Sequence, residues 1–130
     1  MNDKVRIKIW EADAYLEDAQ ARLGPDDEYS ATVAINHATN AIIMALDALC
    51  LNVGLDPPKR HDLAEVSLRT MMLKGKLPES ASTWRDLLIQ MSTQRTGLQY
   101  RGKLASRADA RRFIRDAAGF VAFARSQIQL

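Results

Sequence analysis

Apolar and polar residues follow one another along this chain with a helical period, most clearly in the stretch that begins at Tyr29. From Tyr29 to Leu46, 18 consecutive residues carry no charge. Within this stretch and just beyond it, alanines recur at a spacing of 4, 3, 4 and 3 residues, which places their methyl groups on one helix face. Because methyl groups let helix backbones approach closely, the pattern predicts the central, largely buried helix of an all-α bundle, ending at Gly54. The alanines are Ala34, Ala38, Ala41, Ala45 and Ala48.

A first helix is predicted over residues 3–23, with Asp3 as its N-cap. Gly24 and Pro25 end it, since a glycine in the left-handed conformation followed by a proline commonly closes a helix. We expect its core face to be formed by six apolar residues, namely Ile7, Ile9, Trp10, Ala14, Leu16 and Ala21.

A third helix is predicted after Pro57 and Pro58, because two adjacent prolines cannot lie inside a helix. It begins between Asp56 and Asp62 and fades at residues 74–76. Asp62 and Glu65 have the spacing of a capping box, in which two side chains each bond the other residue's backbone N–H.

Two more helices complete the predicted bundle. The fourth is capped by Ser80 or Ser82 and ends between Arg95 and Tyr100, where Gly97 weakens it. Its buried residues are predicted to be Trp84, Leu87, Leu88 and Met91. The last runs over residues 107–127 behind a capping box of Ser106 and Asp109, with a core face of Phe113, Ala117, Phe120, Val121 and Ala124 and with Arg111, Arg112 and Arg115 off that face.

The composition fits one globular domain over residues 1–130. Aromatic residues make up only 6% of the chain while alanines number 19, which favours helices packed through small residues. The single cysteine, Cys50, cannot form an intramolecular disulfide, and the N-terminus has no apolar signal region, so we expect a cytoplasmic location. Polar residues such as Asn36 and His37 interrupt the uncharged stretch, and no membrane association is expected.

Charge is unevenly distributed although the net charge is only +2. Residues 1–30 carry four basic and eight acidic side chains, and residues 95–130 carry eight basic and two acidic ones. The basic end can form a surface that binds phosphates. The alternative is an acidic helix and a basic helix that pack against each other, and the sequence alone leaves both interpretations open.

Three groups of residues can carry chemistry. Arg95, Tyr100 and Arg101 combine guanidinium groups, which match phosphate oxygens, with a phenol that can stack on a base. Their alternative role is to close the bundle at its surface. Asn36 and Asn40 share a helix face and can line a site, or they can bond each other or a neighbouring helix.

His61 opens the third helix, where it can act as a base, contact phosphate or serve as a local cap. His37 and Asp47 lie beside the two asparagines on the central helix. Two histidines on different helices and one cysteine do not make a metal site, and neither a metal nor a cofactor is expected.

Three features together resemble the HEPN superfamily (higher eukaryotes and prokaryotes nucleotide-binding), in its nucleotidyltransferase-associated or toxin-like branch. They are the alanine-rich helix from Tyr29, the Pro-Lys-Arg-His-Asp-Leu sequence at residues 58–63, and Arg95 followed by four residues and Tyr100. The resemblance covers roughly residues 5–128. It implies an up-and-down bundle of four to five helices that forms a two-fold dimer, and a nucleotidyltransferase or antitoxin as a partner protein.

Many HEPN proteins are metal-independent endoribonucleases, whose motif is an arginine followed by four to six residues and a histidine. In one branch of the family the motif reads arginine, four residues, tyrosine and histidine. Arg95 and Tyr100 match that branch, but the position expected for the histidine is occupied by Arg101. Arginine stays protonated and has no acceptor, so Arg101 cannot be a general base. We therefore expect a binding module for RNA, a nucleotide or a partner protein. The alternatives are an endoribonuclease of the toxin–antitoxin type that uses Arg95 and Tyr100, and a structural dimer with no ligand.

Overall fold

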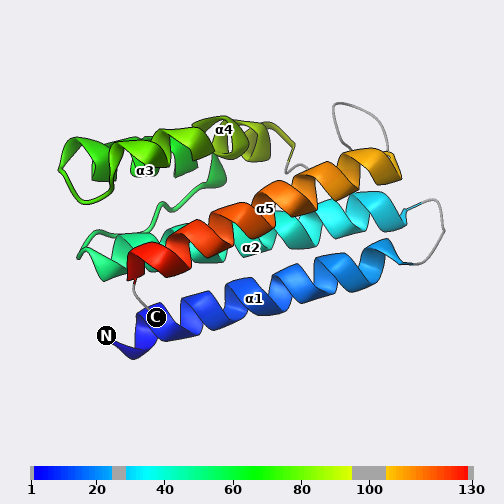
Figure 1. The fold of residues 1–130 in the computed structure, drawn as a ribbon, viewed down its shortest axis with the longest axis horizontal. Coiled ribbons are helices and arrows are strands. Elements are labelled where there is room, and N and C mark those ends of the chain that lie inside the picture. The colour runs from blue at the N-terminus through cyan, green and yellow to red at the C-terminus, as the bar shows by residue number, and fades with distance from the viewer. Residues whose placement is uncertain (1, 25–28, 95–104, 129–130) are drawn as a thin grey trace.

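The computed structural model describes residues 2–24, 29–94 and 105–128, and these residues form α-helices and short 3-10 helices without a β-strand (Figure 1). The expectation of an all-α bundle is confirmed. In chain order the described elements are α1 (Asp3–Leu23), α2 (Ser30–Asn52), the 3-10 helix η1 (His61–Leu63), α3 (Ala64–Leu73), the 3-10 helix η2 (Glu79–Trp84), α4 (Arg85–Gln94) and α5 (Arg107–Ile128).

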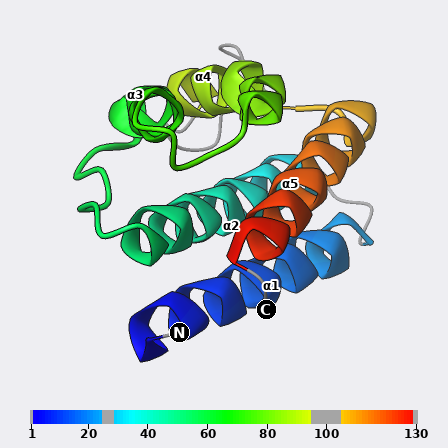
Figure 2. The same ribbon diagram turned by 60° about the vertical axis from the view of Figure 1, so that its left-hand side comes forward.

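Three long helices, α1, α2 and α5, pack against one another, and α2 contacts both of the others. Figure 1 and Figure 2 show α3 and α4 as a separate pair of helices on the side of α2 and α5 that faces away from α1. α1 and α2 run in opposite directions, whereas α5 runs in the same direction as α2 (Figure 1). α2 is therefore the central element, as its sequence predicts.

The alanine face of α2 lies in the core, and all five of its alanines are fully buried. α2 is long enough to cross a membrane, and an 18-residue window within it has a mean hydropathy of 1.4. However, 61% of that window is buried inside the bundle. The burial of α2 by its neighbours is that of a core helix. The core residues predicted for α5, from Phe113 to Ala124, are likewise all buried.

The predicted core face of α1 is wrong at two large residues. Ile7 is 54% exposed and Trp10 is 70% exposed, whereas Ile9 is buried as expected. Ala14 and Leu16 are partly buried, and Ala21 is exposed. Only a narrow face of α1 meets α2 and α5, because no described element lies against the opposite face. Hydrophobicity alone therefore overestimated the core face of α1. The buried residues of α1 are Val5, Ile9, Ala12 and Ala19.

Both ends of α1 also differ from prediction. The N-cap is Asn2, whose Oδ1 accepts a hydrogen bond from the Val5 N–H at 3.0 Å, so Asp3 belongs to the first turn. Gly24 has φ −60° and ψ −49°, which is right-handed helical backbone, so the predicted left-handed closing residue is absent there. Left-handed glycines do end two other stretches, at Gly54 with φ +78° and at Gly75 with φ +70°.

One predicted capping box forms and one does not. At the start of α5, the Ser106 N–H donates to Asp109 Oδ2 at 3.1 Å and the Asp109 N–H donates to Ser106 Oγ at 3.0 Å. At α3, Asp62 instead pairs with Arg60, and Glu65 pairs with arginines on its exposed side. α3 follows a 3-10 turn without a side-chain cap, and no serine caps η2 either, since Pro78 occupies that position.

Trp84, at the end of η2, joins the second pair of helices to α5. Its ring lies 5.9 Å from the ring of Phe120 in an edge-to-face arrangement and 6.1 Å from that of Phe123. A Cβ atom added to Gly119 would lie 2.7 Å from Cη2 of Trp84. The absence of a side chain at Gly119 therefore lets the indole lie directly against α5.

Candidate functional site

The stretch with the strongest predicted chemistry, which contains Arg95, Tyr100 and Arg101, lies outside the described residues. The structure does describe the residue at which the chain resumes. The Ala105 N–H donates to Thr32 Oγ1 at 3.1 Å, and both residues are buried. This bond holds the start of α5 against the first turn of α2.

Asn36 and Asn40 follow Thr32 at intervals of four residues, so the three side chains lie on successive turns along one side of α2. Both asparagines are partly exposed. Within the described residues no hydrogen bond joins the two amides, so the prediction that they satisfy each other is not seen. The amides lie one and two turns from Thr32, which Ala105 contacts.

Asp47 lies further along α2 and is only 9% exposed. Its Oδ2 is 3.8 Å from Nζ of Lys8 on α1, while its Oδ1 is buried with no hydrogen-bond partner among the described residues. Burial raises the pKa of Asp47, and the charge of Lys8 opposes that increase. The same lysine also contacts Sδ of Met44 at 3.6 Å, so it bridges the outer sides of α1 and α2.

The first half of α5 presents arginines to solvent. Arg111, Arg112 and Arg115 are exposed, as the sequence predicts. Arg112 pairs with Asp109 at 2.6 Å and Arg115 lies 3.7 Å from Asp116, whereas Arg111 has no ion pair within the described part of the chain. This basic face follows directly on the Ala105–Thr32 contact and lies at the same end of the bundle as Asn36.

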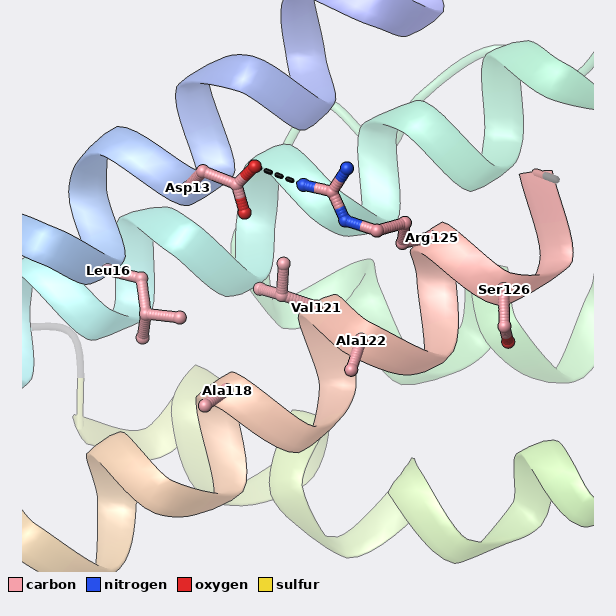
Figure 3. A pocket seen from close by; sticks show the side chains of 7 residues that line it. All are labelled: Asp13, Leu16, Ala118, Val121, Ala122, Arg125 and Ser126. Carbon is pink, nitrogen blue, oxygen red and sulfur yellow. Dashed lines mark hydrogen bonds and ion pairs between the residues drawn. The ribbon is translucent and has the colours of Figure 1, made fainter. Parts of the chain in front are cut away.

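At the other end of α5, Arg125 forms an ion pair and hydrogen bond with Asp13 of α1 (Figure 3). Figure 3 shows the pair above a shallow hollow between the two helices, of about 460 Å³, where Ala118 and Ala122 leave space. Here a helix of the acidic N-terminal region and the basic last helix do pack together, as the second interpretation of the charge distribution predicts, whereas phosphate binding by the exposed arginines stays a prediction.

His61 lies in η1, which packs against α4. It is partly buried, and the neighbouring Arg60 Nε donates to Asp62 Oδ1 at 3.1 Å. His37, by contrast, lies on α2, and its Nδ1 is buried with no partner among the described residues. The two histidines therefore belong to different surroundings, and only His61 is next to the helix that leads to Arg95.

Cys50 is buried near the end of α2, at the base of an apolar hollow of about 210 Å³ lined by Leu55 and Pro58 and by residues of η1 and α3. Burial raises the pKa of its thiol to about 12, and the charge of Asp47 adds to the increase. The thiol is therefore protonated and unreactive at neutral pH. Across residues 2–24, 29–94 and 105–128, no group of three or more His, Cys, Asp or Glu residues is placed to hold a metal ion.

The comparison with known protein families decides what this bundle is. The family model for the HEPN domain matches residues 6–127, which is nearly the whole chain. The chain belongs to the HEPN family. Its central alanine-rich helix and its all-helical architecture agree with that assignment. No curated protein matches the chain.

Membership of the HEPN family is consistent with a module whose function relates to nucleotides or RNA. The sequence reasoning missed Thr32 as a positioning residue of this HEPN domain. A threonine in a helix often bonds the backbone one turn earlier, as Thr39 does to the Ile35 carbonyl at 2.9 Å. Thr32 instead accepts a hydrogen bond from another element, and nothing in its local sequence distinguishes the two cases.

Proposed function

We propose that this HEPN domain is a non-catalytic binding module that contacts RNA or a nucleotide. The surface comprises Arg95, Tyr100 and Arg101, with Asn36, Asn40 and the exposed arginines of α5 at its border. The proposal rests mainly on the Ala105–Thr32 hydrogen bond. That bond joins the chain that follows Arg101 to α2 one turn before Asn36.

The chemistry of these side chains fits a polyanion that carries bases. Guanidinium groups bind phosphate oxygens through two parallel hydrogen bonds, and arginine keeps its charge at any physiological pH. Asparagine amides offer donors and acceptors to base edges or ribose hydroxyls, and a phenol ring stacks on a base. Since Arg101 cannot accept the proton of a ribose 2′-hydroxyl, the same groups bind RNA without a base to cleave it.

The test is direct binding of a fluorescent single-stranded RNA and of a nucleotide, measured by anisotropy. We expect the Arg95→Ala/Arg101→Ala variant to bind RNA at least tenfold more weakly than the wild type. The matched control is Arg6→Ala/Arg60→Ala, which removes the same number of arginines from exposed positions elsewhere. Equal, negligible binding by the wild type and both variants would contradict the RNA proposal and favour a protein partner, such as a nucleotidyltransferase or an antitoxin.

One observation favours the alternative of an endoribonuclease of the toxin–antitoxin type. η1 packs against α4, so His61 lies beside the helix that leads to Arg95. In that alternative His61 supplies the base that Arg101 cannot. RNA incubated with the pure protein in EDTA would be cleaved, and cleavage would be lost in both Arg95→Ala and His61→Asn. RNA that stays intact for hours supports the binding module.

We also propose that the domain forms a two-fold dimer through the outer face of α2. This face carries Asn36, Asn40 and Ile43 and is partly exposed. Amides can pair with copies of themselves across a two-fold axis, because each offers both a donor and an acceptor. Light scattering is expected to give twice the monomer mass for the wild type and the monomer mass for Asn40→Arg. A wild-type mass equal to one chain would contradict the dimer, including the version of it without a ligand.

A further inference from the structure

The outer side of α3 carries an apolar stripe that no described element covers. We call Leu63, Val66, Thr70 and Leu73 the α3 stripe; they follow one another at intervals of 3, 4 and 3 residues, which places them on one helix face. Leu63 is 37% exposed, Val66 is 43% exposed and Leu73 is 83% exposed. Single exposed apolar residues are common, but three of them along one side of η1 and α3 are typical of an interaction surface.

The α3 stripe is bordered by hollows and by positive charge. The hollow beside Cys50 lies along Leu63 and Val66, and a second one of about 250 Å³ lies along Leu73. Glu65 is already engaged, since it pairs with Arg69 at 3.5 Å and with Arg85 at 2.9 Å, whereas Glu79, which lines the second hollow, has no ion pair within the described residues. The exposed lysines of this region have no ion pair within the described residues; they are Lys59, Lys74 and Lys76.

A second stripe with the opposite charge lies on α1. We call Ile7, Trp10 and Ala14 the α1 stripe; they are three of the residues that the sequence assigned to the core and that the structure leaves partly or largely exposed. Its acidic neighbours are Glu11, Glu17 and Asp18, none of which has an ion pair within the described part of the chain, and they outnumber the one basic side chain that lies one turn before Trp10, Arg6. Trp10, Ala14 and their neighbours Glu11, Tyr15 and Asp18 surround a hollow of about 250 Å³.

We propose that the α3 stripe of one molecule docks on the α1 stripe of a second copy. The two stripes complement each other in three ways: both are apolar, one is bordered by lysines and the other by carboxylates, and Leu73 protrudes where the α1 stripe has a hollow beside Trp10. A single contact thus covers the two most exposed large apolar side chains among the described residues, Leu73 and Trp10.

The geometry makes this contact head-to-tail. Figures 1 and 2 show α1 and α3 on opposite sides of the layer formed by α2 and α5, so one molecule presents both halves of the contact in different directions. Such a contact joins different surfaces of the two copies and can be repeated from molecule to molecule. It is distinct from the two-fold contact through α2 proposed above and does not depend on RNA binding.

Sedimentation velocity tests the contact. We expect the wild-type mass to rise at least twofold above its value at high dilution as the concentration approaches about 1 mM. The rise should be smaller in about 500 mM salt than in about 50 mM salt, because the flanking charges are then screened. In the proposed contact, Leu73→Asp brings a carboxylate against the carboxylates beside the α1 stripe of the second molecule, and Trp10→Lys brings an ammonium group against the lysines beside its α3 stripe. Each variant should therefore keep the mass seen at high dilution. Ala122→Asp and Ala122→Lys, exposed on α5 and outside both stripes, are matched controls that should behave as the wild type.

Mixing the two defective variants gives the decisive measurement. Leu73→Asp retains the α1 stripe and Trp10→Lys retains the α3 stripe, so an equal mixture can form one head-to-tail contact and should give a complex that contains both variants. A wild-type mass that stays constant up to about 1 mM would overturn the proposal. A mixture that does not associate, or Ala122 variants that lose assembly as well, would also overturn it. Circular dichroism melts verify that each variant is folded, and unchanged RNA binding separates this contact from the RNA surface.

Discussion

At the scale of single residues, the sequence predicts small buried side chains better than large exposed ones. The alanines of α2 are buried because a methyl at helical spacing has one efficient use, which is close packing of helices. Trp10 and Ile7 are exposed although the sequence assigned them to the core. Hydrophobicity identifies a helix face that would benefit from burial, but it does not show whether a neighbouring element covers that face. Asp47 is the opposite case, a charged residue in an apolar setting, and it has measurable consequences.

The packing of the α2 alanines predicts a cost for enlarging one of them. Ala41 is fully buried, so Ala41→Leu must displace its neighbours and is expected to lower the free energy of unfolding by about 1–3 kcal/mol. Urea denaturation measures the change. Ala122→Leu adds the same atoms to an exposed position of α5 and should change stability by less than about 0.5 kcal/mol. Equal stability of Ala41→Leu and the wild type would mean that this face of α2 is open.

Asp47 gives stability a dependence on pH. Because its pKa is raised, the folded protein keeps the proton to a higher pH than the unfolded chain does. Its contribution to stability is therefore most favourable below the ordinary value of 3.8 and falls as the pH rises through the raised pKa. We expect Asp47→Asn to be more stable than the wild type at pH 7, and the difference to shrink as the pH approaches 4.

Denaturation of both proteins between pH 4 and pH 7 tests this sign. Asp116→Asn is the matched control, because the Asp116 carboxylate is about half exposed and lies 3.7 Å from Arg115, so its removal should have little effect at any pH. A stability difference for Asp47→Asn that grows on acidification would show that Lys8 outweighs the effect of burial.

At the scale of helices, the sequence predicts which elements exist and misses several of their ends. The five α-helices lie where the apolar periodicity places them, and the Ser106–Asp109 box caps α5, since each of these two side chains bonds the backbone N–H of the other residue. The same spacing fails at Asp62 and Glu65 because arginines compete for both carboxylates. Arg60 and Arg69 are close in sequence to the carboxylates they pair with, whereas Arg85 comes from another helix, α4, which local sequence does not relate to Glu65. Contacts between elements thus decide which local signals are realised.

The packing of Trp84, at the end of η2, against Gly119 of α5 gives a prediction at this scale. Glycine to alanine in an open helix gains about 0.5–1 kcal/mol, but at Gly119 the new Cβ would meet the Trp84 ring at 2.7 Å. We therefore expect Gly119→Ala to destabilise the protein by about 1–3 kcal/mol. In a Trp84→Phe background the smaller ring leaves space, and Gly119→Ala should then be neutral or stabilising. A double-mutant cycle from thermal melts measures this coupling, and additive effects would contradict it.

At the scale of the whole molecule, sequence periodicity identifies the apolar face of each helix but not the element that packs against it. It identifies α2 as central, yet it does not show that α3 and α4 lie on the side away from α1 (Figure 2) or that α5 starts against Thr32. The candidate site was predicted from residue types and from the HEPN resemblance, and Arg95, Tyr100 and Arg101 remain predictions. What the structure adds is the setting of Ala105, where the approach to α5 and its exposed arginines is bonded to Thr32, one turn before Asn36 of α2.

That setting predicts how RNA binding depends on salt. Each arginine that neutralises a phosphate of a single strand contributes about −0.7 to the slope of log K against log salt. Arg111→Ala, which removes an exposed arginine without an ion pair in the described part of the chain, should reduce the magnitude of the slope by about 0.7. Titrations at several salt concentrations measure it. Arg60→Ala is the control, and equal slopes for the wild type and Arg111→Ala would place the RNA away from α5.

The burial of Cys50 has a practical consequence for all of these measurements. A thiol whose pKa is about 12 and whose side chain is enclosed reacts with an alkylating reagent only after α2 becomes accessible through opening of the bundle. Because the chain has a single cysteine, the alkylation rate under native conditions reports that opening without any engineered label. In each variant, the alkylation rate of Cys50 thus measures how often the centre of the protein comes into contact with water.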